Sequence, residues 1–572
     1  MFEYSYENLR RASQTENGKK LLEEVKRAYE SLYSASPIPV SRYAHFKLIY
    51  QTGDRDSYQA TYYDKRKRFC YLQLLALADE RYLEALEDVL NAILEEYTWV
   101  LPAHCLQKDN SFDYSVIDLF SAETGYYLAE TLYVFGERLS ADIRLRIASE
   151  LKRKIIDNYE NRTQLWEELK NNWAAVCAGS VGIVYLYAFP ERFAAVKDRL
   201  FRSLENYLDG LTDEGVSLEG VGYWVYGFGF FTQFFDIYEQ LLGERPELLA
   251  CEKVEKSLRY IENACLGGKC YLPFADGGHK QTYVHPNVSY AAKRLFKDGY
   301  SLPEYYCIDE EFVLQLPQKS GKASAFRALY GVAEFGLSEK NRTKENKSVY
   351  YAESQIFIYK GEKYSFAAKC GNNSETHNHN DVGSFQIVVD GEGVIVDPGP
   401  AKYTWQYFKD DEVRYGEKTF AAGSMGHSVP IVNGGYQKLG VENVGGVLEV
   451  TDRNFKFDFA KAYDGVESLV VNYRMLDEGV RVEYDCKGIE KGVTFRFLSF
   501  NRPTLNADGD VCVGGVTLKS LSGLRPNVQE IKYKGHINII SAFDEETIYA
   551  IDFPVNGKST VREEFDFRPL RS

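Results

Sequence analysis

The first half of the chain has the hydrophobic period of amphipathic helices. Apolar residues recur at steps of three and four between Leu83 and Tyr97, as one buried helix face requires. Ser140 stands at an N-cap position before a second such run, Ile143, Ile147, Leu151 and Ile155. The pattern predicts further helices over 115–135, 173–189, 193–208, 226–242 and 254–265. Many helices of similar length joined by short loops favour a toroid or solenoid of helical hairpins.

Near residue 330 the hydrophobic period changes from that of helices to that of strands. Val480, Val482 and Tyr484 alternate with polar residues, and Val493, Phe495 and Phe497 alternate with Thr494 and Arg496. Glycine-containing turns at 390–393 and 433–435 punctuate this half. We therefore predict a multidomain α+β protein, with a helical (α/α) toroid over 1–335 and an antiparallel β-sandwich over 336–572. The polar stretch 338–347 is the expected linker.

Charge and composition narrow the class of partner. The net charge of −15 argues against nucleic acid, and an acidic glycan would need a locally basic groove. Aromatic residues make up 15% of the chain, enough for a large core and for a cleft lined with rings that stack on sugars. No run of 18 apolar residues occurs, so a membrane partner is not expected. Self-association into a homo-oligomer is left open.

Cysteine usage and the N-terminal residues bear on location. The 10 cysteines are scattered without a CxxC pair, which is typical of reduced, mostly buried thiols. Residues 1–33 are charged and polar throughout, unlike a secretory signal. We expect a cytoplasmic protein.

Asn171-Asn172-Trp173 precedes an apolar, small-residue helix. Paired asparagines at a helix start are first of all capping residues. An asparagine amide in that place also hydrogen-bonds a substrate carboxylate, with the helix dipole helping. Taken alone, the stretch favours the interpretation that the two asparagines cap the helix.

Two glycine-rich stretches, 219–226 and 273–279, also carry polar groups. In the first, Gly220 and Gly222 indicate a tight backbone before a helix, and Tyr223 and Tyr226 are expected to share a face of its first turn. Taken alone, these tyrosines favour packing, because a phenol works as acid or base only when neighbours tune its pKa. In the second, Asp276 either contacts a ligand together with His279 or simply caps the turn, and we weigh the two equally.

The strongest signal is a group of histidines in the strand-rich half. His377 and His379 lie in the segment HNHND, Asp397 ends a later strand, and His427 follows. Two imidazoles and a carboxylate make a plausible zinc set. A lone histidine would favour a structural role, whereas this cluster favours function. The likeness to HNH nucleases is superficial, because neither their ββα metal fold nor a basic surface is indicated.

Together these stretches resemble the heparinase II/III family of polysaccharide lyases. The likeness is most specific at 377–398, where HNHND, a strand, a turn, a second strand and DPG follow the family's pattern. It is looser at 171–173 and in the EGxxYxxY segment. That family pairs an N-terminal (α/α) toroid with a C-terminal antiparallel β-sandwich. The resemblance implies a carbon–oxygen lyase that cleaves a uronate glycan, such as a heparan sulfate or heparin, hyaluronan or chondroitin type, by β-elimination.

The resemblance also implies roles for individual residues. Asn172 looks like the group that binds and neutralises the uronate carboxylate. Tyr223 or Tyr226 looks like the phenol that acts as base or acid, and His377 looks like its imidazole partner across the cleft. The expected substrate contacts are Asn171, Trp173, Glu219, Asp276, Asn378, Tyr403, Arg414 and Tyr415.

A structural zinc is implied as well, and no organic cofactor. His379, Asp397 and His427 look like the ligands with which several family members hold zinc, where the metal organises the sandwich. The chain departs from the family's pattern at two places. Trp173 stands where some members have a histidine, so a catalytic imidazole there is absent, and His427 lies in a less typical context.

Two other functions compete with a lyase. A glycoside hydrolase on a similar toroid would use two facing carboxylates, for which Glu219 and Asp276 are the candidates. A catalytically inactive acidic-glycan-binding protein would keep the cleft without the chemistry. The nature of the products separates the three.

Overall fold

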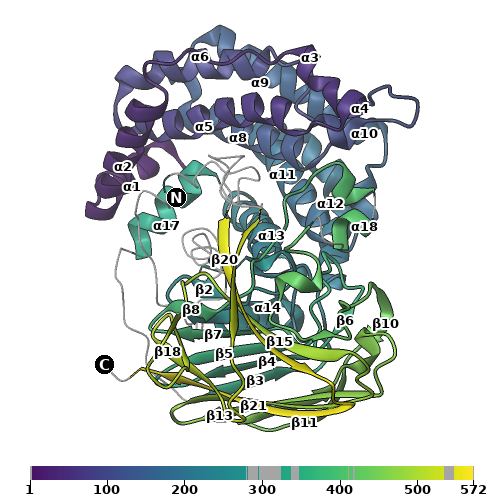
Figure 1. Ribbon diagram of the computed structural model, residues 1–572. Helices are drawn as coiled ribbons and strands as arrows, with labels where there is room; N and C mark the ends of the chain where they lie inside the picture. Colours follow the sequence, from purple (N-terminus) through teal and green to yellow (C-terminus); the bar gives the residue numbers. More distant parts are fainter. Residues whose placement is uncertain are drawn as a thin grey trace.

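The protein has a helical half and a strand-rich half. The computed structural model describes residues 3–278, 280, 294–295, 313, 324–335, 347–409, 411–415, 419–533 and 546–570. Helices arch over the upper part of the molecule and stacked strands form its lower part (Figure 1). This is the predicted order of a helical toroid followed by an antiparallel sandwich, and the predicted fold class is confirmed.

The helical half consists of short and long helices packed as hairpins. Its α-helices are α1 (Tyr6–Ser13), α2 (Glu16–Leu32), α3 (Tyr43–Phe46), α4 (Leu48–Thr52), α5 (Asp56–Ala78), α6 (Leu83–Leu94), α7 (Pro102–Cys105), α8 (Leu119–Phe135), α9 (Ala141–Leu151), α10 (Asp157–Asn161), α11 (Asn172–Ala188), α12 (Pro190–Asp209), α13 (Val221–Leu242), α14 (Glu252–Ala264) and α17 (Ala325–Phe335). Helix α11 is buried along almost its whole length and packs against α8, α12 and α13.

The predicted helices are present, and several ends differ from the prediction. Helix α6 ends at Leu94, so Tyr97 lies outside it and is 68% exposed. Helix α8 begins at Leu119 because the Asp118 carboxylate accepts a hydrogen bond from the backbone N–H of Ser121. Ser140 does stand at the N-cap of α9, although its side chain makes no capping hydrogen bond.

The strand-rich half is antiparallel throughout its described pairs. Its strands are β3 (Lys347–Tyr351), β4 (Ile356–Lys360), β5 (Ser365–Lys369), β6 (Asn372–Asn373), β7 (Phe385–Val389), β8 (Glu392–Ile395), β9 (Ile431–Val432), β10 (Gly440–Val444), β11 (Gly446–Val450), β12 (Asn454–Asp458), β13 (Ser468–Leu476), β14 (Gly479–Lys487), β15 (Gly492–Ser499), β16 (Thr504–Leu505), β17 (Val511–Val513), β18 (Val516–Ser520), β19 (Asn527–Tyr533), β20 (Glu546–Asn556) and β21 (Thr560–Pro569). A short hairpin of β1 (Cys265–Gly267) and β2 (Cys270–Tyr271) precedes them.

Two layers make the sandwich. One is the eight-stranded sheet β11-β12-β13-β14-β21-β18-β17-β16. The other combines the five-stranded sheet β3-β4-β5-β7-β8 with the four-stranded sheet β19-β20-β15-β9, which meet where the Val396 N–H donates to the Leu498 carbonyl. One apolar core draws its side chains from both layers. The turn between β7 and β8 has positive φ at Asp390 and Gly391, as a tight hairpin requires.

Alternation along β14 follows the prediction, whereas β15 departs from it. Val480, Val482 and Tyr484 are buried, and the residues between them face outward. Strand β15 is buried on both faces, so Arg496, expected to face outward, is 7% exposed. Its guanidinium donates two hydrogen bonds to the Asp552 carboxylate, at 2.8 Å each, which satisfies the buried charge.

The outer face of the five-stranded sheet packs against the helical half. Ile356, Ile358, Ala367 and Val388 belong to the same buried cluster as the apolar side chains of the helices. The predicted boundary at residue 335 coincides with the end of α17, and the expected linker at 338–347 lies almost entirely outside the described residues. The division into two domains stays a prediction.

The remaining features of the fold are the state of its cysteines and the length of its helices. The nine described cysteines are free thiols, seven of them buried, while Cys307 lies outside the described residues. Within the described part of the chain, every helix is too short or too polar to cross a bilayer.

Candidate active site

Two glycine-rich stretches interlock to build one wall of the site. Gly220 has a φ of 94°, and a Cβ there would lie 2.6 Å from the backbone nitrogen of Gly277. Only glycine permits this approach, which sets the start of α13 directly against the turn that carries Asp276. The sequence feature that indicated a tight backbone therefore positions two carboxylates, Glu219 and Asp276, in one place.

His377 lies between these two carboxylates. Its Nε2 is 3.2 Å from Glu219 Oε1, and its Nδ1 is 2.5 Å from Asp276 Oδ2. Its backbone has a φ of 54°, a costly conformation for a residue with a side chain and one that recurs at functional sites. Burial lowers the pKa of His377, but hydrogen bonds with Asp276 and Glu219 outweigh it and raise the pKa to about 9.

Asn172 and Glu219 are joined by two hydrogen bonds. The Asn172 side-chain amide and its backbone N–H each donate to the Glu219 carboxylate at 2.9 Å. Asn172 is 1% exposed, at the first position of α11. Its neighbour Asn171 is the N-cap, whose side chain accepts a hydrogen bond from the Trp173 N–H at 3.1 Å. The paired asparagines thus divide into a cap and a carboxylate-binding amide.

Tyr223 faces His377. Their rings are stacked with centroids 4.1 Å apart, and the Tyr223 hydroxyl is 2.9 Å from the hydroxyl of Tyr403. Burial raises the pKa of Tyr223 well above its ordinary value, and the negative charge of Asp276 adds to the rise. Tyr223 therefore holds its proton in the ligand-free site.

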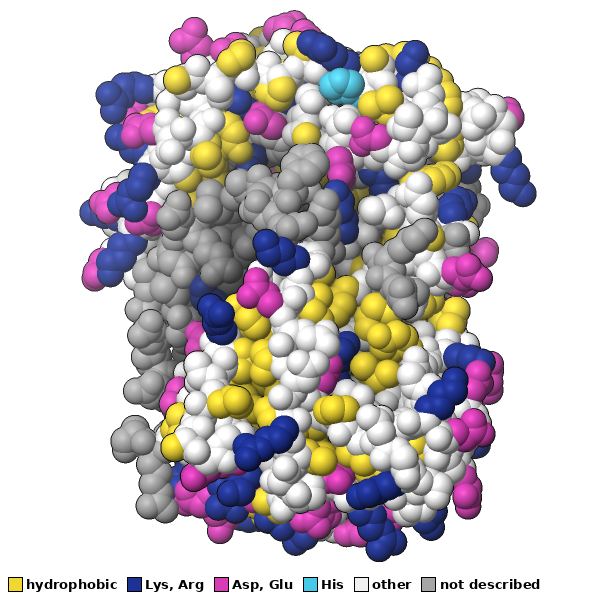
Figure 2. Space-filling view, viewed as in Figure 1, with side chains coloured by type: hydrophobic (Ala, Val, Ile, Leu, Met, Phe, Trp, Pro, Cys, Tyr) yellow, Lys and Arg dark blue, Asp and Glu magenta, His cyan; other side chains and the backbone are white. Residues whose placement is uncertain are grey.

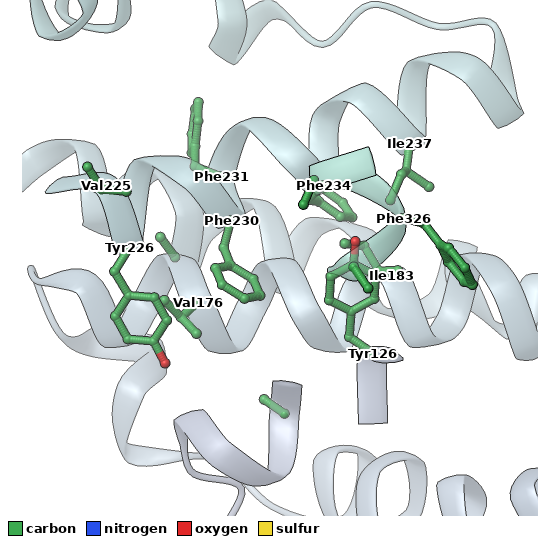
Figure 3. Close-up of a cluster of buried hydrophobic side chains, with 14 of the residues drawn as sticks. Tyr126, Val176, Ile183, Val225, Tyr226, Phe230, Phe231, Phe234, Ile237 and Phe326 are labelled. Carbon is green, nitrogen blue, oxygen red and sulfur yellow. The ribbon is translucent and has the colours of Figure 1, made fainter. Parts of the chain in front are cut away.

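Tyr226 lies elsewhere. It was expected to share a face with Tyr223, but its ring points into the helical core beside Val176 and Phe230 (Figure 3). Its hydroxyl donates to the Glu123 carboxylate on α8, and burial raises its pKa. The structure therefore brings Tyr223, and not Tyr226, together with His377.

Asp276 holds three side chains of the site together. Its carboxylate contacts His377 Nδ1, His379 Nε2 at 3.2 Å and the hydroxyl of Tyr403. Burial acts to raise the pKa of Asp276, but hydrogen bonds from the two histidines hold it well below its ordinary value. A permanently ionised carboxylate here orients its partners rather than donating a proton.

A buried triad lies behind this site. Ligand atoms of His379, Asp397 and His427 all lie within 4.8 Å of one another, and the three residues are buried. The His427 Nδ1 is 2.6 Å from an Asp397 oxygen. His379 Nδ1 and His427 Nε2 are buried without a hydrogen-bond partner among the described residues. Two unpartnered imidazole nitrogens beside a carboxylate match the donor set that zinc prefers.

The triad and the site share one residue. The Nε2 of His379 contacts Asp276, while its Nδ1 has no hydrogen-bond partner among the described residues. A metal ion bound at Nδ1 would leave Nε2 to a supporting carboxylate. A buried ion pair between Lys369 and Asp381, at 2.8 Å, anchors the end of the HNHND segment. His377 and His379 share Asp276 as a partner, but His377 also contacts Glu219, whereas His379 belongs to the triad.

The remaining predicted contacts lie around this centre. Asn378 is buried, and its amide donates to the Asn380 side chain at 3.1 Å. The Arg414 guanidinium, on α18 (Asp411–Tyr415), lies 4.6 Å from the ring centroid of Tyr407 and 5.0 Å from that of Tyr415. His279 lies outside the described residues.

The sequence did not single out a segment of the helical half that contacts residues next to Tyr403. The Arg55 guanidinium lies 5.1 Å from the ring centroid of Phe408, and that ring contacts Tyr403 edge-on at 5.0 Å. Beside them Lys402 forms an ion pair with Asp56 at 2.7 Å. No local pattern indicates these partners, because the fold alone brings residues 55 and 408 together.

One face of the molecule shows how charged and hydrophobic side chains are distributed over the surface (Figure 2). Figure 2 shows Lys and Arg intermixed with Asp and Glu around the outer rim of this face, while hydrophobic side chains gather between the two halves. Two guanidinium groups, those of Arg55 and Arg414, lie over aromatic rings beside the site.

Comparison with solved structures places the fold. No protein-family model matches the sequence, and no curated protein matches it significantly. The chain is similar to a crystal structure of heparinase III, with a TM-score of 0.61 and 13% identity over 97% of this chain and 93% of that one. A mutant heparan sulfate lyase from Pedobacter heparinus matches with a TM-score of 0.57 and 11% identity, over 98% and 93%.

A third structure has the same arrangement. The chondroitin AC lyase of Streptomyces coelicolor A3, in complex with chondroitin sulphate, matches with a TM-score of 0.54 and 11% identity, over 99% of this chain and 83% of that one. The chain therefore has the fold of these lyases, and the architecture expected from the family resemblance is confirmed.

Proposed function

We propose that this protein is a lyase that cleaves a uronate-containing glycan by β-elimination. The observation that carries the proposal is the grouping of Asn172, Tyr223 and His377 around one point, although they come from two helices and the sandwich. These are the residue types that elimination needs: a neutraliser for the carboxylate, an acid or base, and a cationic partner.

The first task is to neutralise the uronate carboxylate, because that makes the C5 proton acidic enough to leave. In the ligand-free protein the Asn172 amide and His377 Nε2 both contact the Glu219 carboxylate. This pair of donors thus already holds one carboxylate. We place the substrate carboxylate on the same donors, in place of Glu219, with the imidazolium supplying the positive charge.

The second task is proton transfer. The Tyr223 hydroxyl contacts that of Tyr403, which in turn donates to Asp276, so a chain of hydrogen bonds positions the phenol. Tyr223 first gives up its phenolic proton to water, because Asp276 stays ionised. The phenolate takes the C5 proton, the C4–O bond breaks as the C4=C5 double bond forms, and Tyr223 returns the proton to the departing oxygen. The stacked His377 ring supports the anionic intermediates.

We further propose that His379, Asp397 and His427 hold a structural zinc ion. When bound, the ion organises the sandwich without taking part in proton transfer. His379 then fixes Asp276 through its other nitrogen, and Asp276 in turn orients His377 and Tyr403.

Elimination fits the site better than hydrolysis. Glu219 and Asp276 contact opposite nitrogens of one imidazole, so that ring lies between them where a glycosidic bond would have to lie. The lowered pKa of Asp276 is also the opposite of what a general acid requires.

The fold, and the need of an acidic glycan for cations at the site, support one class of substrate. A heparan sulfate lyase and a chondroitin AC lyase share the fold, which supports a glycosaminoglycan as substrate. A non-catalytic glycan-binding protein would have no need for a chain of hydrogen bonds that holds Tyr223 against His377. A cytoplasmic location and a homo-oligomer stay predictions of the sequence.

The test is product analysis on uronate polymers and oligosaccharides. A lyase creates an unsaturated uronate that absorbs in the low ultraviolet and consumes no water. A hydrolase yields saturated ends, and a binding protein leaves the chains intact.

A further inference from the structure

We propose that Arg55 binds a second acidic group of the glycan, a sulfate or carboxylate on the sugar next to the uronate that is cleaved, and that Arg414 supports it. The inference rests on the proposed function, because it gives the cleft its neighbouring subsite. It assigns a specificity role to a residue of the toroid that neither the sequence nor the family likeness indicated.

The backbone around Arg55 is built to reach the sandwich. Gly53 has a φ of 74°, and a Cβ there would lie 3.0 Å from the Trp405 side chain. This close approach, together with the ion pair between Asp56 and Lys402, fixes the start of α5 against the segment that carries Phe408. Arg55 is thereby held at the junction of the two halves rather than on a free loop.

Three successive contacts connect Arg55 to Tyr223. Its guanidinium lies over the ring of Phe408, which contacts Tyr403, and the Tyr403 hydroxyl contacts Tyr223. Phe408 is 47% exposed, so a ring face and a cation are presented together beside the hydrogen-bonded pair of Tyr403 and Tyr223. Sugars stack on such rings while their acidic groups meet the cation.

The charge of Arg55 is not neutralised within the described part of the chain. Asp56, the adjacent carboxylate, is paired with Lys402, and no described carboxylate forms an ion pair with Arg55. Partial burial removes water from the guanidinium and lowers the pKa of Arg55. Besides Asp56, the groups that favour its positive charge are the phenols of Tyr63, Tyr403 and Tyr223. An unpaired, partly desolvated guanidinium in a cleft is a site for an oxyanion.

Arg414 supplies a second cation at the same group of aromatic rings. It lies over Tyr407, whose ring is 5.2 Å from that of Tyr403 and 5.1 Å from that of Phe408. Its Nε is buried without a hydrogen-bond partner among the described residues. Both guanidinium groups thus lie over rings of one aromatic group that includes Tyr403.

The ligand must be a multiply charged glycan. One carboxylate is taken by Asn172 and His377, so a guanidinium outside that pair needs a further anionic group on the same chain. Sulfate and carboxylate both match the planar fork of arginine, and lysine does not reproduce that geometry.

The experiment measures binding without turnover. Tetrasaccharides of the heparan, chondroitin and hyaluronan types, the first two with and without sulfate, are titrated calorimetrically into the Tyr223→Phe protein. The Arg55→Gln and Arg55→Lys substitutions are then added to that background. We expect Arg55→Gln to weaken binding about tenfold or more, and Arg55→Lys to weaken it less. Arg81→Gln, at a guanidinium that is 87% exposed, is the matched control and leaves affinity unchanged.

The outcomes separate this inference from the proposed function. A loss confined to sulfated ligands identifies the group as sulfate, and an equal loss on all of them identifies a carboxylate. If the parent binds a tetrasaccharide and both Arg55 variants, with unchanged melting temperature, bind it equally well, the Arg55 subsite is refuted while elimination stands. If the parent binds none of the panel, the subsite is refuted. The proposed function fails separately if the unsubstituted protein cleaves none of these glycans.

Discussion

The Nδ1 atom of His377 lies 2.5 Å from Oδ2 of Asp276, and the other oxygen of that carboxylate lies 3.2 Å from Nε2 of His379. One buried carboxylate thus joins the histidine of the proposed catalytic centre to a histidine of the proposed zinc site. Apart from this shared carboxylate the two histidines of the HNHND segment have different neighbours, Glu219 for His377 and the triad for His379.

Replacing Asp276 by asparagine should impair turnover more than binding. The amide keeps the volume but cannot accept hydrogen bonds from His377, His379 and Tyr403 as a carboxylate does, so the chain of hydrogen bonds that positions Tyr223 loses its end. We expect kcat to fall about 10- to 100-fold with KM changed far less. Asp464→Asn, at a carboxylate whose side chain is 76% exposed, is the control. Equal losses in kcat and in folded fraction would show that Asp276 is only structural.

The two tyrosines of the EGxxYxxY segment should respond in opposite ways. Tyr223→Phe removes the proposed proton carrier, and we expect kcat to fall about 100- to 10,000-fold with stability nearly unchanged. Tyr226→Phe removes a buried hydroxyl that donates to Glu123, so it should cost about 1–3 kcal/mol of unfolding free energy while kcat stays close to normal. Rates and melting temperatures of both variants decide the matter, and the reverse pattern would assign the chemistry to Tyr226.

The buried triad should hold zinc. Elemental analysis of the purified protein is expected to find about one zinc per chain, and His427→Ala should abolish it. A chelator should lower the melting temperature, since zinc at a thousandfold excess over its Kd stabilises by about 4 kcal/mol. His45→Ala removes a histidine outside the triad and should leave the zinc content intact. A zinc-free protein whose stability is insensitive to chelators would contradict the assignment.

Glu130 should make the fold sensitive to alkaline pH. It is 1% exposed on α8, and burial raises its pKa to about 8, although the Ser324 hydroxyl and Arg327 oppose the rise. Because the folded pKa exceeds the unfolded value, its contribution to stability is complete below about pH 4.5 and is lost as pH rises through 8. Glu130→Gln should flatten this dependence by a few kcal/mol at most. Chemical unfolding at pH 5, 7 and 9 checks it, with Glu16→Gln, an exposed carboxylate, as control.

Period and turn chemistry predicted much of the fold. The helical period located every long helix from α6 to α14, and the alternation of β14 matched its burial, because local patterns record which face meets the core. Alternation gave the wrong face for Arg496, because β15 is buried on both sides. Its guanidinium is paired with the carboxylate of Asp552, 56 residues later.

The site could be predicted only in part. The resemblance placed His377 at the cleft and His379 near Asp397 and His427, which the structure brings together as a triad. The contact between Asp276 and His377 spans 101 residues, and the spacing of either residue gives no sign of it. Tyr226 shows the same limit, because a separation of three residues on a helix does not decide which phenol meets the cleft and which meets Glu123.

The most direct test of the account is the mass of the products that the unsubstituted protein releases from uronate tetrasaccharides of the heparan, chondroitin and hyaluronan types. We predict, for at least one of them, two fragments whose masses add up to that of the substrate, one of them absorbing in the low ultraviolet. Fragments that together exceed the substrate by one water molecule would show hydrolysis and contradict the proposed elimination, as would a failure to cleave any member of the panel.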